Sequence, residues 1–109
     1  MELRELEAFV RVVDLGGFRK AAETLYITQP AVTRQIAILE RELGTRLLER
    51  MGKKVLLTSS GEVLYNYATQ MLHLRSEAQR RVEDVREGTS GRLTIGASST
   101  AATYVLPAL

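Results

Sequence analysis

The chain has 109 residues, of which 45% are hydrophobic and 26% are charged, and its formal net charge at pH 7 is +2. This composition is typical of a globular protein and excludes a disordered or collagen-like chain. Because no apolar run reaches the roughly 18 residues of a membrane span and no apolar signal segment follows Met1, we expect a cytoplasmic protein. The chain has no cysteine and one histidine, so we expect no enzyme, no metal and no cofactor.

The positive charge is concentrated in one part of the chain. The segment 28–54 contains six basic and three acidic residues, whereas the segment 59–91 contains four basic and five acidic residues. A surface that binds a polyanion requires such a local excess of cations. The first half of the chain is therefore the place to look for a nucleic-acid interface.

Two helices are predicted before residue 26. Apolar residues follow a helical period from about Glu2 to Leu15, and the glycines Gly16 and Gly17 suit the left-handed backbone that ends a helix. The period resumes over two turns with the apolar residues Phe18, Ala21, Ala22 and Leu25. This pattern predicts a second, short helix that another helix approaches closely, since its alanines are small.

A third helix is predicted from Thr28 to Gly44. Thr28 is a good N-cap, Pro30 lies in the first turn where its missing N–H is not needed, and Ile27 can pack on Val32. Gly44 ends the helix. Helical spacing places one apolar row inward, Val32, Ile36, Leu39 and Leu43, and leaves the opposite row facing outward, Gln29, Thr33, Arg34, Ala37 and Arg41.

A strand hairpin follows the third helix. The segments 47–50 and 55–58 flank a glycine-containing connector at 51–54, which has the length of a hairpin loop. Arg50, Lys53 and Lys54 then lie on or near its tip. Two helices joined by a tight turn and followed by such a wing predict a mainly α fold, with a winged helix-turn-helix domain at residues 1–58.

Residues 59–87 predict one long linker helix, which Ser59 or Ser60 can cap. Its apolar residues repeat every seven positions, and the stripe is too long for a domain of 58 residues to cover. We therefore expect a homodimer in which an identical helix covers the stripe. The predicted interface residues are Leu64, Tyr67, Met71, Leu74, Ala78, Val82 and Val85.

Residues 88–109 predict a hinge and the start of a second domain. A breaker at 88–91 precedes an alternating, strand-like segment at 92–96, and the hydroxyl side chains at 98–100 can cap a short helix that Pro107 interrupts. One strand and one short helix cannot bury their apolar faces. We therefore expect the rest of this domain to be missing from the chain.

At this point the sequence resembles a known family over residues 1 to about 65. The residues that carry the resemblance to the N-terminal region of LysR-type transcriptional regulators are Glu2–Phe9, Gly17–Leu25, Thr28–Ile36, Leu39–Glu40, Glu42–Gly44, Leu47–Arg50, Leu57–Thr58 and Gly61–Glu62. The resemblance implies a dimer on an interrupted palindrome of double-stranded DNA. It also implies an effector-binding domain in a longer protein, where Ser99 and Thr100 lie at the inducer pocket and a tetramer is possible.

The third helix then provides the residues that read the DNA. Its outer face near the N-terminus carries the expected base contacts Gln29, Pro30, Thr33 and Arg34, because such residues reach base edges in the major groove. The expected contacts to the DNA backbone are Arg19, Lys20, Thr28, Arg50, Lys53 and Lys54. This chain departs from many relatives at Gly17 and Thr33, where they carry serine, and the extra methyl group of Thr33 can touch thymine.

Two other functions fit parts of the sequence: a small-molecule sensor, and a dimerisation module that does not bind DNA. Titration of this chain with candidate inducers tests the first function, and we expect it to give no heat. Binding to duplex DNA at low salt tests the second, which requires that no duplex is bound. His73 has no second metal ligand nearby and is expected on the surface or at an interface. Tyr65 and Tyr67 could be mistaken for base-stacking residues, but the helical position of Tyr67 favours dimer packing.

Overall fold

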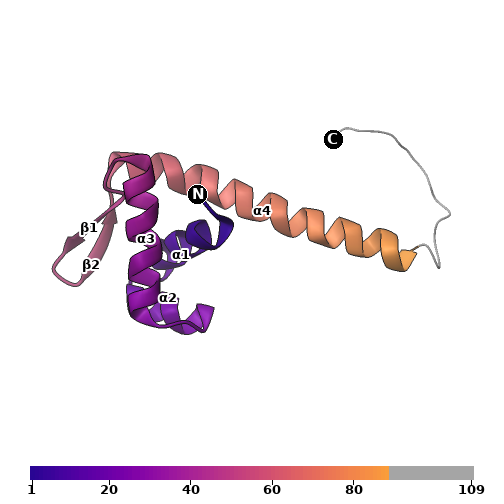
Figure 1. Ribbon diagram of the computed structural model, residues 1–109, viewed down its shortest axis with the longest axis horizontal. Helices are drawn as coiled ribbons and strands as arrows, with labels where there is room; N and C mark the ends of the chain where they lie inside the picture. The colour runs from indigo at the N-terminus through magenta and orange to yellow at the C-terminus, as the bar shows by residue number, and fades with distance from the viewer. Residues whose placement is uncertain (89–109) are drawn as a thin grey trace. The chain divides into compact units, whose positions relative to one another are not determined.

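The computed structural model describes residues 1–88, so the predictions for the strand at 92–96 and for Ser99 and Thr100 lie outside the described residues. The elements are α1 Leu3–Leu15, α2 Phe18–Leu25, α3 Gln29–Leu43, β1 Leu48–Met51, β2 Lys54–Leu57 and α4 Ser59–Gly88 (Figure 1). Two compact units divide the chain, Met1–Leu74 and Arg75–Leu109, and the second is described as far as residue 88. The mainly α fold with a winged helix-turn-helix is confirmed.

Helix α1 begins and ends with specific caps. Glu5 Oε1 accepts the backbone N–H of the N-cap residue Glu2 at 3.2 Å, and the N–H of Glu5 is donated to the carbonyl oxygen of Glu2 at 3.0 Å. At the other end Gly16 has φ of 78° and donates its N–H to the carbonyl oxygen of Val12 at 2.9 Å. The predicted stop at the glycine pair is confirmed, because this backbone conformation is open to glycine at little cost.

The turn between α2 and α3 contains an unusual residue. Tyr26 ends α2 with φ of 58°, a left-handed conformation that a residue with a side chain rarely adopts, and its side chain is 94% exposed. The next N–H, of Ile27, is donated to the carbonyl oxygen of Ala22 at 3.1 Å. This short turn sets the start of α3 directly after α2.

Helix α3 has the predicted caps. The hydroxyl of Thr28 accepts the N–H of Ala31 at 3.2 Å, and Gly44 ends the helix with φ of 70°. Of the four residues predicted to face inward, Val32, Ile36 and Leu39 are buried. Leu43 is 43% exposed, so its predicted burial is wrong. The chain reverses at Gly44, and Leu47, which is 1% exposed, is buried after the turn instead.

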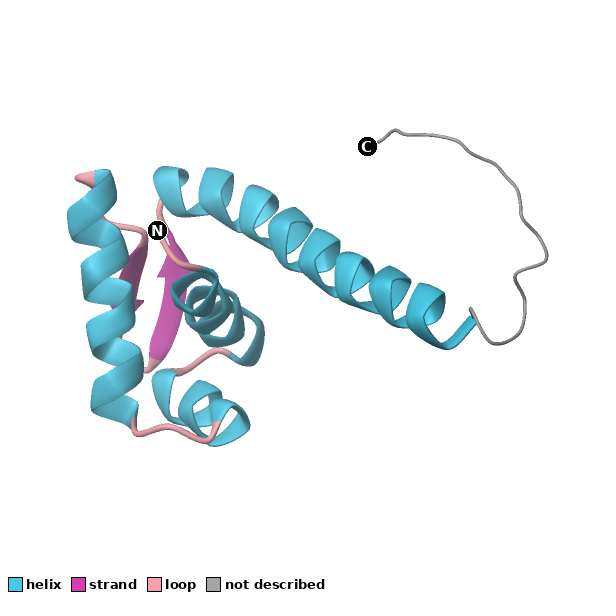
Figure 2. Cartoon of the chain, turned by 45° about the vertical axis from the view of Figure 1, so that its right-hand side comes forward, coloured by secondary structure: helices cyan, strands magenta, loops and turns pink. Residues whose placement is uncertain are grey.

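The wing is a two-stranded antiparallel sheet, drawn in magenta in Figure 2. Its register pairs Leu48 with Leu57 and Met51 with Lys54, which leaves a two-residue turn at 52–53. The predicted connector of four residues is therefore shortened to two, because the first strand lies one residue later than the predicted 47–50 and the second one residue earlier than the predicted 55–58. The reason is Gly52, whose φ of 65° is the first-position conformation of a type II′ turn and allows this tighter connection.

The core of the first unit combines residues from the helices with residues from the wing. Its largest fully buried side chains are Leu6, Phe9, Val12, Val32, Leu39 and Leu47. Helix α1 contacts α2, α3 and β2, so it holds α3 and the wing on one scaffold. At roughly 25 cal/mol for each square ångström of apolar surface buried, this core is the main source of stability.

Helix α4 is capped by Thr58, not by the predicted Ser59 or Ser60. The Thr58 hydroxyl accepts the N–H of Gly61 at 3.0 Å and donates to the carbonyl oxygen of Arg46 at 2.6 Å. The N–H of Thr58 is also donated to the carbonyl oxygen of Leu47 at 3.0 Å. The capping bond to Gly61 is local, but the two bonds to Arg46 and Leu47, which precede the wing, fix Thr58 as the residue at the start of α4.

In the first unit, α4 has a covered face and an exposed face. Leu64 and Ala68 belong to the core, and Met71 packs partly against it. Leu64 is only 9% exposed, so it lies in this chain's own core and the expectation that a partner covers it does not fit. Another face of the same segment carries Val63, Tyr67 and Leu74, which are 59%, 60% and 61% exposed. The predicted stripe is thus divided, since the domain covers its first part.

The described part of the second unit is the end of α4, which stops at Gly88, one residue beyond the prediction. Ala78, Val82 and Val85 are exposed there. Arg81 pairs with Glu77 at 4.0 Å, and Arg86 pairs with Glu83. Such pairs within one helix each contribute a few tenths of a kcal/mol, so they support the helix without covering its apolar side chains.

One hydrogen bond attaches α4 to α1, and its removal gives a first prediction. The Tyr65 hydroxyl donates to Asp14 Oδ1 at 2.5 Å, and this bond is the main cause that raises the pKa of Tyr65 above its ordinary value. We expect Tyr65→Phe to lower the free energy of unfolding by about 0.5–1 kcal/mol at pH 7, measured by urea unfolding. Because the pKa of Tyr65 is raised in the folded state, the bond stabilises the fold fully at pH values below the ordinary tyrosine pKa of ~10. The difference in unfolding free energy between the two chains should therefore shrink as the pH rises above that value.

The matched control is Tyr67→Phe on the same helix. Tyr67 is 60% exposed, and within residues 1–88 its hydroxyl makes no hydrogen bond. We expect this variant to remain within about 0.5 kcal/mol of the parent chain. Equal stabilities of the two variants would contradict the role of the Tyr65 bond.

Candidate nucleic-acid interface

The four predicted base-contact residues lie together on the outer face of α3. Gln29, Pro30, Thr33 and Arg34 are all exposed, and with Ala37 they line one shallow groove. We call these four residues the readout face. The hydroxyl of Thr28 is used as the helix cap, so it positions the first turn of α3. That turn contains no acidic residue, and the positive end of the helix dipole therefore favours a nearby phosphate.

The wing continues this surface. One depression is lined by Thr33 and Ala37 of α3, Arg46, Arg50 of β1, Phe18 of α2, and further residues of the same elements. A second depression is lined by Gly17, Phe18, Gln29, Arg50, Gly52, Lys53, Lys54 and Val55. We call Arg50, Lys53 and Lys54 the wing cations. The readout face and the wing cations share these depressions, so they form one continuous surface.

The predicted DNA-backbone residues differ in their present partners. Over residues 1–88, no ion pair or hydrogen bond within the chain engages the side chain of Arg34, of Lys20 or of any wing cation. Arg19, in contrast, pairs with Glu23 Oε2 at 3.2 Å. A cation without a carboxylate partner is available to a phosphate, so Lys20 and the wing cations are better placed than Arg19 to bind one.

Glu40 fixes the wing beside α3, a role that the sequence did not indicate. Its Oε2 atom accepts the backbone N–H of Leu47 at 2.8 Å and that of Leu48 at 3.3 Å. Arg46 lies nearby, with its Nε atom 3.9 Å from the same oxygen. Charge-assisted bonds of this kind are stronger than neutral ones, so Glu40 holds the first strand of the wing against the helix.

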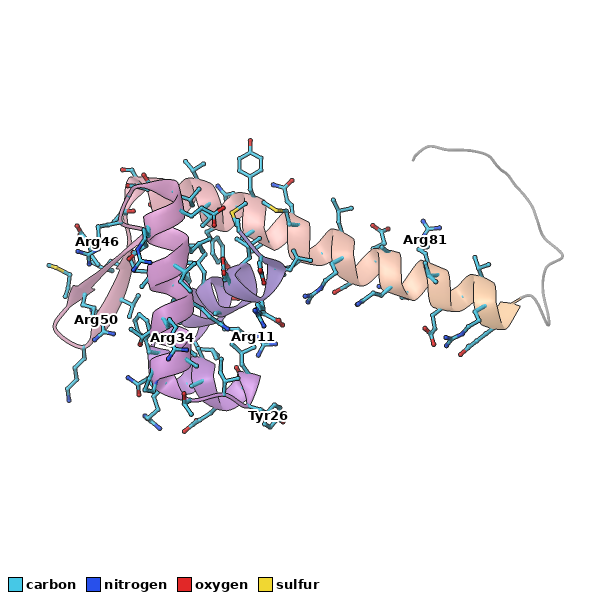
Figure 3. The ribbon with its side chains drawn as sticks, in the orientation of Figure 1. Arg11, Tyr26, Arg34, Arg46, Arg50 and Arg81 are labelled. Atoms are coloured by element: carbon cyan, nitrogen blue, oxygen red, sulfur yellow. The ribbon has the colours of Figure 1, made fainter. Side chains whose placement is uncertain are left out.

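Sequence reasoning also missed Phe18 and Tyr26. The guanidinium carbon of Arg50 lies 4.3 Å from the centre of the Phe18 ring, although Phe18 was expected only in the core and Arg50 near the tip of the wing. Arg50 lies within β1, opposite Val55. Figure 3 shows Arg34 projecting from α3, Arg46 and Arg50 from the wing side, and Tyr26 from the turn after α2. The only available sequence signal for Tyr26 was an aromatic residue two positions before the N-cap Thr28.

Two further observations concern residues 1–88. In that range no three acidic, histidine or cysteine side chains are grouped as metal ligands would be. None of the helices described there is long and apolar enough to cross a membrane.

This geometry defines a class of protein. A winged helix-turn-helix whose third helix exposes glutamine, threonine and arginine, with cations on the adjoining wing, is the architecture of a DNA-reading domain. Residues 3–62 match the family described as bacterial regulatory helix-turn-helix protein, lysR family. The chain belongs to the LysR family, a family of transcriptional regulators and not of enzymes, so the expectation of no catalysis is confirmed.

Relatives with curated descriptions share this sequence over nearly its full length. The chain is 44% identical over 107 residues to a probable RuBisCO transcriptional regulator of Cyanidioschyzon merolae, covering 98% of this chain and 35% of the relative. It is 40% identical over 105 residues to a protein of the same description from Synechocystis, covering 96% of this chain and 30% of the relative. The chain therefore spans about a third of the length of these relatives.

Solved structures of similar fold include DNA complexes. The DNA-binding domain of BenM with catB site 1 DNA is 40% identical, with a TM-score of 0.76, and the match covers 84% of this chain and 99% of that one. The DNA-binding domain of CbnR with DNA is 35% identical, with a TM-score of 0.72, covering 79% and 99% of the two chains. The fold is thus one that is found bound to DNA in both of those proteins.

Proposed function

We propose that this chain binds double-stranded DNA sequence-specifically, with α3 in the major groove and the wing against the adjoining backbone. The observation that carries the proposal is the continuous surface formed by the readout face and the wing cations. Its cations have no carboxylate partner within residues 1–88, so phosphates do not have to displace one. The DNA complexes of BenM and CbnR support the same use of the fold.

Each residue of the readout face has a defined chemistry. The amide of Gln29 pairs with the N6 and N7 atoms of adenine, and the guanidinium of Arg34 pairs with the O6 and N7 atoms of guanine. The hydroxyl of Thr33 forms a hydrogen bond with a base edge, and its methyl group contacts the methyl group of thymine. Pro30 lies in the same groove as Gln29, Thr33 and Arg34, and its ring makes apolar contact with a base edge. Thr28, Lys20 and the wing cations contact phosphates and set the register of α3.

The proposal includes a homodimer formed through α4. In the first unit Val63, Tyr67 and Leu74 share one exposed face, and in the second unit Val82 and Val85 are exposed. Apolar side chains this exposed are stabilised when a second copy covers them. A symmetric dimer presents two α3 helices, so its site is an interrupted palindrome with one half-site for each copy.

In a protein of the relatives' length, a small-molecule effector bound beyond residue 88 changes how dimers associate into tetramers on DNA. The proposal places the protein in the cytoplasm, since it must share a compartment with its DNA. Relatives described as probable RuBisCO transcriptional regulators support a role in controlling transcription.

Selection of bound duplexes from a random pool, with this chain alone, tests the proposal. We expect enriched duplexes to contain two half-sites related by two-fold symmetry with a fixed spacing. A pool that stays unenriched, together with no retained duplex at low salt, would overturn DNA binding and leave the dimerisation module. Enrichment of single half-sites only would overturn the dimer on the palindrome and keep the readout role.

A charge placed in the proposed dimer contact gives the next prediction. We expect Leu74→Glu to shift the chain from dimer to monomer in sedimentation equilibrium, because the dimer would bury an unpaired carboxylate. His73→Glu is the matched control, since His73 is exposed and lies about 100° round the helix from Leu74. A Leu74→Glu variant that dimerises as well as His73→Glu would exclude this face.

A further inference from the structure

We propose that Phe18 is a positioning residue for DNA binding, because its ring holds the guanidinium of Arg50 in the orientation that meets a DNA phosphate. This inference rests on the proposed function. Phe18 is the first residue of α2 and Arg50 lies in β1, so the rest of α2 and the whole of α3 separate the two residues in the sequence. Their stacking links the helix-turn-helix to the wing.

The stacking geometry is specific. The guanidinium carbon of Arg50 lies 4.3 Å from the ring centre of Phe18, well inside the roughly 6 Å limit for a cation–π interaction. Phe18 is half-buried and packs against the core, so its ring has a fixed position. Arg50 remains exposed, and in the described part of the chain it makes no ion pair. One face of the guanidinium is therefore covered while its N–H edge stays accessible.

The surroundings of Arg50 favour an anion. Arg50 and Phe18 line two depressions. One also contains Lys53, Lys54 and Gln29 and has no carboxylate among its lining residues. The other contains Glu40, whose Oε2 atom accepts the backbone N–H groups of Leu47 and Leu48 and forms no ion pair with Arg50. An arginine side chain has rotamer entropy to lose when it binds. Since the ring already restricts Arg50, part of that cost is removed before DNA arrives, and the planar group can present two N–H donors to a phosphate.

Glu40 restrains the backbone of the same strand. It holds the start of β1 through the N–H groups of Leu47 and Leu48, three and two residues before Arg50. The backbone of β1 is thus fixed by Glu40, and the side chain of Arg50 by Phe18. This division predicts that losing the ring frees the Arg50 side chain without releasing the wing.

A double-mutant cycle on a duplex from the selection tests the inference. We expect Phe18→Leu to weaken binding about twofold to fivefold, the effect of losing one exposed cation–π contact. In the Arg50→Ala background the same change should have almost no effect, because the side chain that Phe18 positions is absent. Phe18→Tyr keeps the ring and should retain the parent affinity.

A second cycle with Lys53 is the control. Lys53 lies at the turn of the wing. We expect Phe18→Leu to weaken DNA binding by the same factor in the Lys53→Ala variant as in the parent chain. Equal coupling of Phe18 to Lys53 and to Arg50 would show that Phe18→Leu moves the whole wing, and would overturn the positioning role. If Phe18→Leu weakens DNA binding by the same factor in the parent chain and in the Arg50→Ala variant, the positioning role is overturned as well.

The free protein provides a readout that does not depend on DNA or on the stability of one variant. The side-chain protons of Arg50 should show ring-current shifts by NMR in the parent chain and in Phe18→Tyr, and lose them in Phe18→Leu. If Phe18→Leu does not fold, Arg50→Lys replaces it, and we expect about a twofold loss of affinity despite the retained charge. A parent chain that binds no duplex contradicts the proposed function, whereas binding with uncoupled Phe18 and Arg50 contradicts this inference alone.

Discussion

Arg34→Ala is expected to weaken binding to a selected duplex by about 1–3 kcal/mol, or roughly fivefold to 150-fold, in a gel shift at fixed salt. Arg34 is exposed on the readout face of α3, beside Gln29, Pro30 and Thr33. Because it has no ion pair within residues 1–88, its loss removes a contact to DNA and leaves no carboxylate unpaired. The loss should be greatest at one base pair, where the preference for guanine relaxes.

Two alanine variants separate base reading from general charge. Arg41→Ala removes the same charge from the same face of α3, seven residues further on and about 10 Å away along the axis, and should change affinity little. Lys53→Ala should weaken binding to all duplexes alike and reduce the slope of log affinity against log salt by about one unit. If Arg34→Ala binds its selected duplex as tightly as Arg41→Ala does, Arg34 does not read a base.

Gly61→Ala is expected to destabilise the chain by about 3 kcal/mol, at the upper end of overpacking effects, and to lower Tm by more than about 10 °C. A Cβ atom on Gly61 would lie 2.1 Å from the carbonyl oxygen of Leu47 and 3.0 Å from Leu57 Cδ2. The first contact is with backbone, which cannot rotate away. The same carbonyl accepts the N–H of Thr58 at 3.0 Å, so moving it also disturbs the cap of α4.

Helix propensity alone predicts the opposite sign, since alanine is favoured over glycine inside a helix by roughly 1 kcal/mol. Thermal unfolding followed by circular dichroism therefore gives a clear decision. Gly17→Ser is the control: no atom lies within 4 Å of an added Cβ there, and a serine N-cap for α2 should stabilise by a few tenths of a kcal/mol. A Gly61→Ala chain with an unchanged or higher Tm would show that α4 does not press against Leu47.

The readout face could be predicted because a helix positions its residues by a local rule. Residues three, four and seven positions apart share a face, so Gln29, Thr33 and Arg34 had to point away from a row that includes Val32 and Ile36. The predicted DNA-backbone residues could not be ranked in this way. Whether Arg19 or Arg50 is available to a phosphate depends on Glu23 and Phe18, and only coordinates show those distances.

The amino-acid pattern was sufficient to predict the order and approximate limits of the helices, the caps at Thr28, Gly16 and Gly44, and the outward row of α3. These features depend on neighbours within about four residues, where side-chain chemistry and backbone geometry act directly. Coordinates were needed to show that Leu64 lies in the core, that bonds to Arg46 and Leu47 hold Thr58 at the start of α4, and that Gly61 must lack a side chain. Those outcomes depend on contacts between α4 and residues before the wing, and a periodic pattern contains no information on which distant backbone will approach it.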